Sequence, residues 1–491
     1  MTPATTATVS AQSRTYFTAP AAQWLQAIGF LLSLALFSLE FWPALLLVGV
    51  FLIHSFRSDR YFFLIELFLL CGGYGYIRPG QFPVNSYDIG LLIGIIGIII
   101  YRRNKMVKRL TLAMLAYFAV ILLIASTSDE TMAIQFRRIR LYLGLVSFFI
   151  PMVIFANRQF EWQKFIHTVM LFTLTICLFY TIDTFILNGG ILVPSATWVR
   201  DSFGKAHYSS ISHLVWDPLS LWWPRHYPYG LYWMALCIIP LATKQVRLRP
   251  LHYALVFLAI FASRTMTFMA GILIGFASFA GQAKKMIKYS LGTIVVLSAL
   301  YAVDSSLGSP MRVASTVDQF TSLSTAADQV DLSEFGSGRM AQIIPKWELL
   351  FRLNRQWLGF GFLHPELTTN PKYAITNEYY TDTSRSEEVA TAVEVTQVQT
   401  IFDIGFVGLL VQTAFYVGLY FMIRRLRHAS YYLCVLITIS VFGLGGFAGL
   451  SLNDGLFLLG LTLGAILLSN PECRLASFPS DSSTTTTTPQ P

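Results

Sequence analysis

The chain has 491 residues, of which 54% are hydrophobic, 15% aromatic and only 12% charged, and its mean hydropathy is +0.57. A soluble globular protein carries roughly 25% charged residues, and half of that charge cannot cover the surface of a water-soluble chain of this size. The composition excludes soluble dinucleotide-binding enzymes, nucleic-acid readers, disulfide-stapled secreted domains and disordered scaffolds. It predicts an all-α polytopic integral membrane protein.

Apolar runs recur along the whole chain at the length of transmembrane helices, which need about 20 apolar residues. Several runs are short and paired through a tight turn, so we expect about 12–14 transmembrane helices. The runs lie near residues 22–39, 41–56, 60–76, 87–101, 109–126, 141–156, 165–187, 229–243, 251–263, 265–282, 289–304, 397–422, 430–448 and 453–469.

The net charge of +9 comes from bases that gather in short loops between these runs. Six loops hold 18 Lys and Arg residues against eight in the short loops of the opposite face. This positive-inside pattern predicts that both chain termini are cytoplasmic. The six loops lie at 57–60, 102–109, 158–164, 244–249, 284–288 and 424–427.

The same scan divides the chain into five parts. Residues 305–396 form an extracytoplasmic loop domain with 11 acidic and seven basic residues, and a loop of this length is expected to contain helices of its own. The other parts are a disordered cytoplasmic tail (1–21), the N-terminal transmembrane helices with an external loop at 188–228 (22–304), the C-terminal transmembrane helices (397–469) and a second disordered cytoplasmic tail (470–491).

An amphipathic helix is predicted after Ser337, which can act as its N-cap. Its apolar face would consist of Met340, Ile343, Ile344, Trp347, Leu350 and Phe351. Arg339 lies in the first turn, where free backbone N–H groups and the positive end of the dipole favour a phosphate. Equally, Arg339 can reach towards lipid headgroups.

Arg264 separates two apolar runs that carry no other charge. The preceding run is about 20 Å long as a helix, shorter than the ~30 Å hydrocarbon core, which places Arg264 below the outer surface. An intramembrane arginine of this kind is a functional candidate. The alternative is a structural ion pair with Asp183 or Asp454.

Further arginines lie on the predicted outer side. Arg137 lies at the outer end of a helix, and Arg200 and Arg225 belong to the aromatic external segment at 188–228. The tryptophans and tyrosines of that segment suit an interfacial belt, and they also suit stacking on sugar rings.

General bases are available in the 305–396 loop. Glu394 stands out because it directly precedes a membrane helix, although an acid there also suits a helix cap. The other candidates are His364, Glu366, Glu378, Asp382, Glu387 and Glu388.

Residues 110–470 resemble the O-antigen ligase and Wzy-type polysaccharide polymerase superfamily in four features, which follow one another along the chain in the order found in that superfamily. They are the aromatic segment leading into 224–241, the helix pair joined by Ser263-Arg264, the loop that opens with Ser337-Gly338-Arg339 and continues through Trp347 to Trp357-Leu358-Gly359-Phe360-Gly361, and the Gly405-Phe406-Val407-Gly408-Leu409 turn.

The resemblance implies a metal-independent glycosyltransferase without cofactors in a bacterial inner membrane. Its donor and acceptor would be polyprenyl-pyrophosphate-linked oligosaccharides. Its partners would be membrane lipid, a flippase and a chain-length co-polymerase. Nucleic acid would have no role. Arg264 and Arg339 would hold the pyrophosphate, and Glu394, or else His364, would act as base. The further substrate-binding residues would be Arg200, Arg225, Arg137 and Trp347.

One departure bears on the reaction. Ligases and many relatives carry a His-Asn-type pair roughly where Glu394-Val395 stands. The absence of this histidine favours a polymerase over a ligase that moves finished glycan to another acceptor. A lipid or solute transporter is the alternative from another class, and the chain lacks the internal repeats common in transporters.

Overall fold

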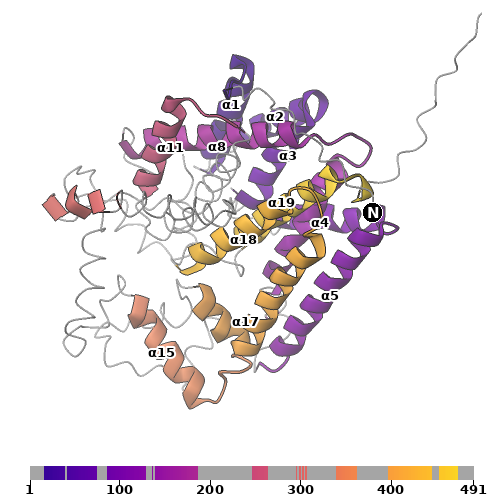
Figure 1. The fold of residues 1–491 in the computed structure, drawn as a ribbon, viewed down its shortest axis with the longest axis vertical. Helices are drawn as coiled ribbons and strands as arrows, with labels where there is room; N and C mark the ends of the chain where they lie inside the picture. The colour runs from indigo at the N-terminus through magenta and orange to yellow at the C-terminus, as the bar shows by residue number, and fades with distance from the viewer. Residues whose placement is uncertain are drawn as a thin grey trace, which may run out of the picture.

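The computed structural model describes residues 16–38, 41, 43–73, 86–128, 135, 139–185, 246–263, 295, 298–299, 301–303, 305–306, 339–361, 396–444 and 453–473. These residues are mostly helical, and among them no β-strand forms beyond an isolated bridge between Tyr16 and Arg247. The all-α prediction is confirmed for this part of the chain (Figure 1).

Helices occupy eleven of the fourteen predicted apolar runs. The predicted runs at 229–243 and 265–282 lie outside the described residues, as does most of 289–304. The helices are α1 (Ala21–Ser38), α2 (Ala44–Ser58), α3 (Arg60–Phe68) with the π-helical η1 (Leu69–Gly73), α4 (Ser86–Ile100), α5 (Lys105–Ala125), the 3₁₀ helix η2 (Arg140–Phe148), α7 (Phe149–Ile154), α8 (Trp162–Phe185), α11 (Pro250–Ser263), α15 (Arg339–Arg352), α17 (Thr396–Ile423), α18 (Ala429–Leu444), α19 (Asn453–Ser469) and the 3₁₀ turn η6 (Pro471–Cys473).

Within the described ranges, three helices are long and apolar enough to cross a membrane. They are α5, residues Trp162–Phe179 of α8, and α17, and several shorter apolar helices accompany them. These helices support a membrane protein. The number of 12–14 spans and the large external domain stay predictions.

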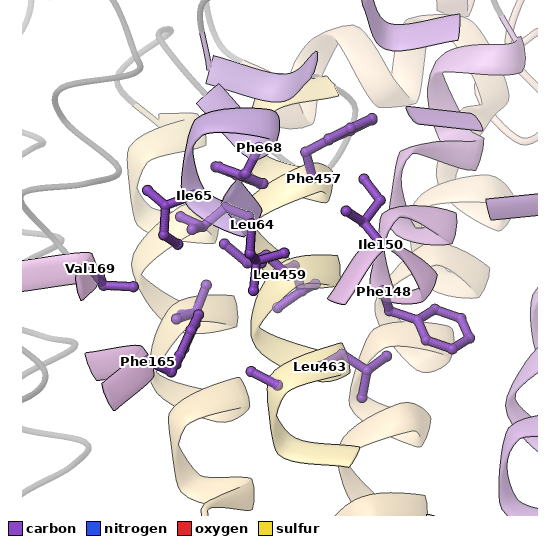
Figure 2. Close-up of a cluster of buried hydrophobic side chains, with 14 of the residues drawn as sticks. Leu64, Ile65, Phe68, Phe148, Ile150, Phe165, Val169, Phe457, Leu459 and Leu463 are labelled. Carbon is purple, nitrogen blue, oxygen red and sulfur yellow. The ribbon is translucent and has the colours of Figure 1, made fainter. Parts of the chain in front are cut away.

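The core is built around α19, which is buried from residue 455 to residue 468. A helix that is apolar all round belongs inside a bundle. Figure 2 shows Leu459 and Leu463 of α19 among side chains of α3, α7 and α8, and Phe68 of α3 lies 6.4 Å from Phe457.

The predicted run at 141–156 is a 3₁₀ helix followed by one short α-helix instead of a regular transmembrane helix. Pro151 has no N–H to donate to residue 147, and its ring would clash with that carbonyl in a continuous α-helix. The narrower segment passes close to α19, where the absence of a side chain at Gly460 and Gly464 leaves room for Ser147 and the Phe148 carbonyl.

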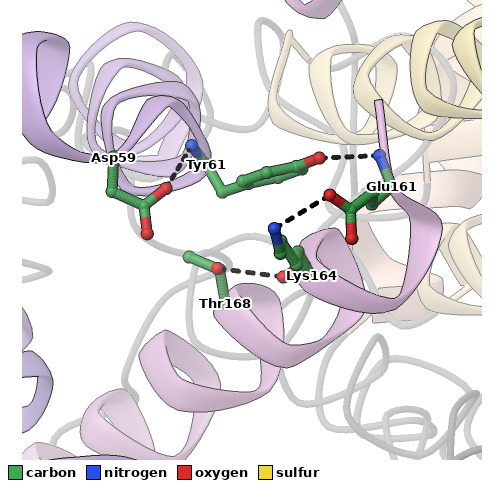
Figure 3. Close-up of polar contacts among 5 residues, drawn as sticks. All are labelled: Asp59, Tyr61, Glu161, Lys164 and Thr168. Atoms are coloured by element: carbon green, nitrogen blue, oxygen red, sulfur yellow. Dashed lines mark hydrogen bonds and ion pairs between the residues drawn. The ribbon is translucent and has the colours of Figure 1, made fainter. Parts of the chain in front are cut away.

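Polar contacts join the basic loops at 57–60 and 158–164 on one face of the bundle (Figure 3). The backbone N–H of Glu161 donates to the Tyr61 hydroxyl at 2.6 Å, and Asp59 caps α3 by accepting from the Tyr61 N–H at 2.8 Å. Lys164 pairs with Glu161 at 2.8 Å on the exposed surface. The loops at 57–60 and 158–164 therefore lie side by side.

Two further contacts extend this face. The ring of Trp162 stacks on His428 with centroids 4.2 Å apart and planes 6° apart. The backbone N–H of Arg427 donates to Asn470 Oδ1 at 2.9 Å. The loop at 424–427 therefore adjoins both the start of α8 and the end of α19.

The start of α5 and the segment before α1 complete the same face. Asn104 Nδ2 donates to the Glu472 carbonyl at 3.3 Å. The backbone N–H of Phe17 donates to the Arg247 carbonyl at 2.7 Å, and the Phe17 ring lies 4.6 Å from His167 near the start of α8. All the basic loops that the structure describes thus share one side, as the charge pattern predicts; the loop at 284–288 lies outside the described residues.

We expect His428 to make the stability of this face depend on pH. Burial, with a smaller contribution from the Arg427 charge, lowers the pKa of His428 from 6.5 to about 4. The unfolded chain takes up a proton near pH 6.5 and the folded chain only near pH 4. The stability contribution is therefore complete above about pH 6.5 and is lost as the pH falls towards about 4.

The test compares thermal unfolding of the purified protein in detergent at about pH 7.5 and about pH 5. His428→Asn tolerates the left-handed backbone at this position, where φ is 68°, and removes the titration. Its unfolding midpoint should fall less on acidification than that of the wild type. His54→Asn, at an exposed position of α2, should keep the wild-type pH dependence. Equal pH dependence of His428→Asn and the wild type would contradict the assignment.

Candidate functional site

Helix α17 is interrupted at Gly405, whose φ of 69° and ψ of −177° are not helical. The second half, residues 406–423, is about 27 Å long at 1.5 Å per residue, close to the ~30 Å hydrocarbon core. This half alone is long enough to cross a membrane, and a span formed by it would have the break at one end.

A break in a helix leaves backbone N–H and C=O groups without partners, and this is costly near hydrocarbon. The segment 356–361 satisfies four of these groups across the break. The hydrogen bonds run from Phe360 N to Phe402 O (2.9 Å), from Gly361 N to Asp403 O (2.8 Å), from Phe406 N to Gln356 O (2.9 Å) and from Val407 N to Trp357 O (3.1 Å). We call this arrangement of 356–361 on 402–407 the junction.

Two glycines allow the backbones of the junction to touch. Gly405 has φ of 69° and Gly359 has φ of 70°, values that other residues adopt only with strain. A Cβ atom at Gly405 would collide with the Trp357 carbonyl, and one at Gly359 would collide with the backbone of Asp403.

Helix α15 packs on the junction through aromatic and aliphatic side chains. The Trp347 ring lies 5.8 Å from Phe406 at 72°, and Trp357 lies 6.1 Å from Phe406 at 60°. The buried members of this cluster are Leu349, Leu350, Phe360, Ile401 and Phe402.

The buried face of α15 is rotated from the predicted one. Phe351, predicted on the apolar face, is 52% exposed, whereas Leu349 and Lys346 are buried. The apolar pattern could not reveal this rotation, because the cation of Lys346 has a specific partner in α17.

That partner is part of a row of three polar side chains, in which Lys346 and Asp403 are buried and Gln399 is half-buried. Lys346 Nζ, with an exposed fraction of 0%, donates to Gln399 Oε1 at 3.4 Å, and Gln399 Nε2 donates to Asp403 Oδ1 at 2.7 Å. The ammonium also lies 4.4 Å from the centre of the Phe402 ring, within range of a cation–π interaction. Asp403 is 7% exposed. We call Lys346, Gln399 and Asp403 the polar bridge.

The far end of α5 also contacts the junction. Arg355 Nη1 donates to the Thr127 carbonyl at 3.1 Å, and Gly361 approaches Ser128 so closely that a Cβ atom would collide with it. Helix α5 starts beside Asn104 on the basic face and ends here. The junction and α15 therefore lie at the opposite end of α5 from the basic loops, as Figure 1 shows.

An open apolar groove of about 540 Å³ adjoins the junction on the second half of α17. It is lined by Trp357, Phe406, Val407, Leu409, Leu410 and Thr413. A groove of this character on a helix that can cross a membrane is suited to hydrocarbon chains. Among the described residues, no three His, Cys, Asp or Glu side chains gather in a way that could hold a metal ion.

Two of the predicted site residues belong to this region. Arg339 is the first residue of α15, and Trp347 joins that helix to the junction. The other predicted site residues, Arg264, Glu394, His364, Arg200, Arg225 and Arg137, lie outside the described residues.

The polar bridge was not predicted as part of a site. A signal for it exists in the sequence, since Asp403 is the only acid in the apolar stretch from 396 to 423 and an ionisable residue in such a stretch is a functional candidate. Gln399 stands one helical turn before it, at a spacing that favours a Gln–Asp hydrogen bond.

No protein-family model matches the chain, and no curated protein matches it.

We expect Gly405→Ala to destabilise the protein. Alanine at positive φ costs about 1–3 kcal/mol in backbone strain, and its methyl group would in addition displace the Trp357 carbonyl. The thermal unfolding midpoint in detergent should fall by several degrees.

Gly418→Ala is the matched control, because this glycine lies in the same helix with nothing within 4 Å of an added Cβ atom. Alanine there should be neutral or stabilise the helix by about 0.5–1 kcal/mol. Equal effects of the two substitutions would show that the break at Gly405 does not depend on glycine.

Proposed function

We propose that the chain is a polysaccharide polymerase that joins polyprenyl-pyrophosphate-linked oligosaccharide repeat units on the extracytoplasmic face of a bacterial inner membrane. The junction is the observation that carries the proposal. It brings together three sequence segments that underlie the resemblance to the O-antigen ligase and Wzy-type superfamily: the helix begun by Arg339, the turn at 357–361 and the turn at 405–409.

The distribution of charge supports the proposed orientation. The basic loops share one face, which the positive-inside rule assigns to the cytoplasm, and α15 lies at the other end of α5. In this orientation, the loop domain at 305–396 is extracytoplasmic, where lipid-linked repeat units are polymerised.

The reaction requires stabilisation of negative charge and removal of one proton. The acceptor hydroxyl attacks the anomeric carbon of the donor, the bond from that carbon to the pyrophosphate oxygen breaks, and the lipid pyrophosphate leaves with the bonding electrons. Guanidinium groups can stabilise the departing charge, and a carboxylate or imidazole can accept the proton of the hydroxyl.

In the proposal, Arg264 and Arg339 hold the pyrophosphate. Arg339 begins a 14-residue helix, and free backbone N–H groups at such an N-terminus add to the attraction for an anion. Arg200, Arg225 and Arg137 assist in substrate binding.

Glu394 is the proposed base, with His364 as the second candidate. Glu394 precedes Thr396, the first residue of α17, by two positions. Trp347, proposed as a contact for sugar, lies edge-on to Phe351 at 6.0 Å and is half-buried.

The orientation is tested with single cysteines and a membrane-impermeant maleimide. Glu348→Cys, at an exposed position of α15, should be labelled in cells whose outer membrane alone is permeabilised. Arg103→Cys, exposed on the basic face, should be labelled only after the inner membrane is opened. The reverse pattern would rule out the orientation and the reaction with it.

The activity is tested by glycan length profiling in a deletion strain. The strain should accumulate single repeat units on the lipid carrier, and wild-type protein should restore long chains. Arg339→Ala and Arg264→Ala should each reduce elongation by about 10²–10³-fold, the range for loss of one charge-stabilising donor. Arg→Lys should rescue only partly, because lysine lacks the bidentate fork.

Arg352→Ala serves as the control, since it removes an exposed arginine from the other end of the same helix. It should leave chain length unchanged. Accumulation of long lipid-linked chains in the deletion strain would identify a ligase instead, and unaltered glycans would remove the chain from this pathway.

A further inference from the structure

The polar bridge connects an ammonium and a carboxylate that lie in different helices. Lys346 belongs to α15, and Gln399 and Asp403 belong to the first half of α17, one helical turn apart. Charged side chains are almost never buried unless they are paired or hydrogen-bonded. The burial of both charges therefore has a specific basis.

Gln399 is suited to bridge these two charges. Its amide oxygen faces the ammonium at 3.4 Å and its amide nitrogen faces the carboxylate at 2.7 Å. The opposite orientation of the amide would place N–H groups against the ammonium and oxygen against the carboxylate. The two charges thus fix the orientation of the amide, and the amide couples the two charges.

The bridge acts at the place where α15 meets the broken helix. Asp403 also accepts a backbone hydrogen bond from Gly361, so the residue that ends the bridge belongs to the junction itself. Arg339 lies seven residues before Lys346, about 10 Å along α15. A tilt of α15 by about 10° around Lys346 would move the start of the helix by about 2 Å, and misplacement by about 1 Å can reduce catalysis 10²-fold.

We propose that Lys346, Gln399 and Asp403 are positioning residues that hold α15 at a fixed angle to α17 and thereby aim its N-terminus at the pyrophosphate of the substrate. This inference rests on the proposed function for the identity of the ligand. The contact of α15 with α17 through the bridge does not depend on the identity of that ligand.

The charge coupling is tested in the purified full-length chain with Lys346→Met, Asp403→Asn and the double variant. Each single substitution removes one of the two buried charges that Gln399 couples, and both substitutions should lower the thermal unfolding midpoint. The double variant removes both charges and should unfold at a higher temperature than either single variant. If the double variant lost as much in unfolding midpoint as the two single variants together, the coupling of the two charges would be overturned.

The positioning role is tested by spin-label distances and ligand binding. Labels at Glu348→Cys in α15 and Leu410→Cys in α17, two exposed positions, report the angle between the helices. The background carries Cys237→Ser, which removes the cysteine outside the described residues; the other four cysteines are buried. Lys346→Met should broaden the distance distribution and weaken binding of farnesyl pyrophosphate, a soluble probe, at least tenfold. Arg352→Gln, which removes an exposed cation of α15, should change neither.

The outcomes separate the inference from the proposed function. A lower unfolding midpoint of Lys346→Met with an unchanged distance distribution and unchanged affinity would overturn the positioning role. A wild-type chain that does not bind farnesyl pyrophosphate would contradict the proposed ligand. In that case, an unaltered distance distribution in Lys346→Met still overturns the fixed angle, and a broadened one supports it.

Discussion

Backbone hydrogen bonding at the break in α17 is the constraint on which the rest of the site depends. Each unpaired N–H or C=O group near hydrocarbon costs several kcal/mol, so the break is stable only while 356–361 occupies it. Residues 356–361 depend on the break in turn, because they form no regular secondary structure and their backbone groups find hydrogen-bond partners at the break. The membrane helix and the segment after α15 therefore specify each other. Helix α15 ends at Arg352, four residues before this segment, and its placement follows from the same bonds.

The two ends of the bundle are stabilised by different interactions. The basic face uses helix caps, stacked rings and hydrogen bonds between loops, such as the Trp162–His428 pair and the bond from Asn104 to Glu472. The opposite end uses backbone bonds and the polar bridge. A loop of basic residues can exchange its contacts with water and headgroups at little cost. The backbone around the break is buried at Phe402, Asp403 and Gly405, so the partners of its N–H and C=O groups must be supplied by the chain itself.

The helices were predictable because burial against protein and burial in lipid demand the same apolar runs. The run at 109–126 became α5 at Lys105–Ala125, and the run at 397–422 became α17. The 3₁₀ segment at Arg140–Phe148 was not predictable, because it depends on how closely α19 approaches. Of the site, Gly405 and Arg339 could be singled out from local sequence. Lys346 could not be singled out, because a lysine on an amphipathic helix is expected on its exposed polar face. Its partner Gln399 lies 53 residues further along the chain.

The position of the junction suits the proposed reaction for a geometric reason. A lipid-linked donor is held in the membrane by its hydrocarbon chain, so its pyrophosphate lies at a nearly fixed depth, close to the boundary. A protein that acts on this bond must hold its cations at the same depth. Gly405 lies about 27 Å from the basic end of α17, so a membrane-spanning α17 would have the junction at the boundary opposite the basic face. The segment that follows α15 is held there by the backbone hydrogen bonds between 356–361 and 402–407, and a shift of one segment along the other would break these bonds. A loop free to change its height above the membrane could bind the same anion, but it could not hold the acceptor hydroxyl in line with the bond that breaks.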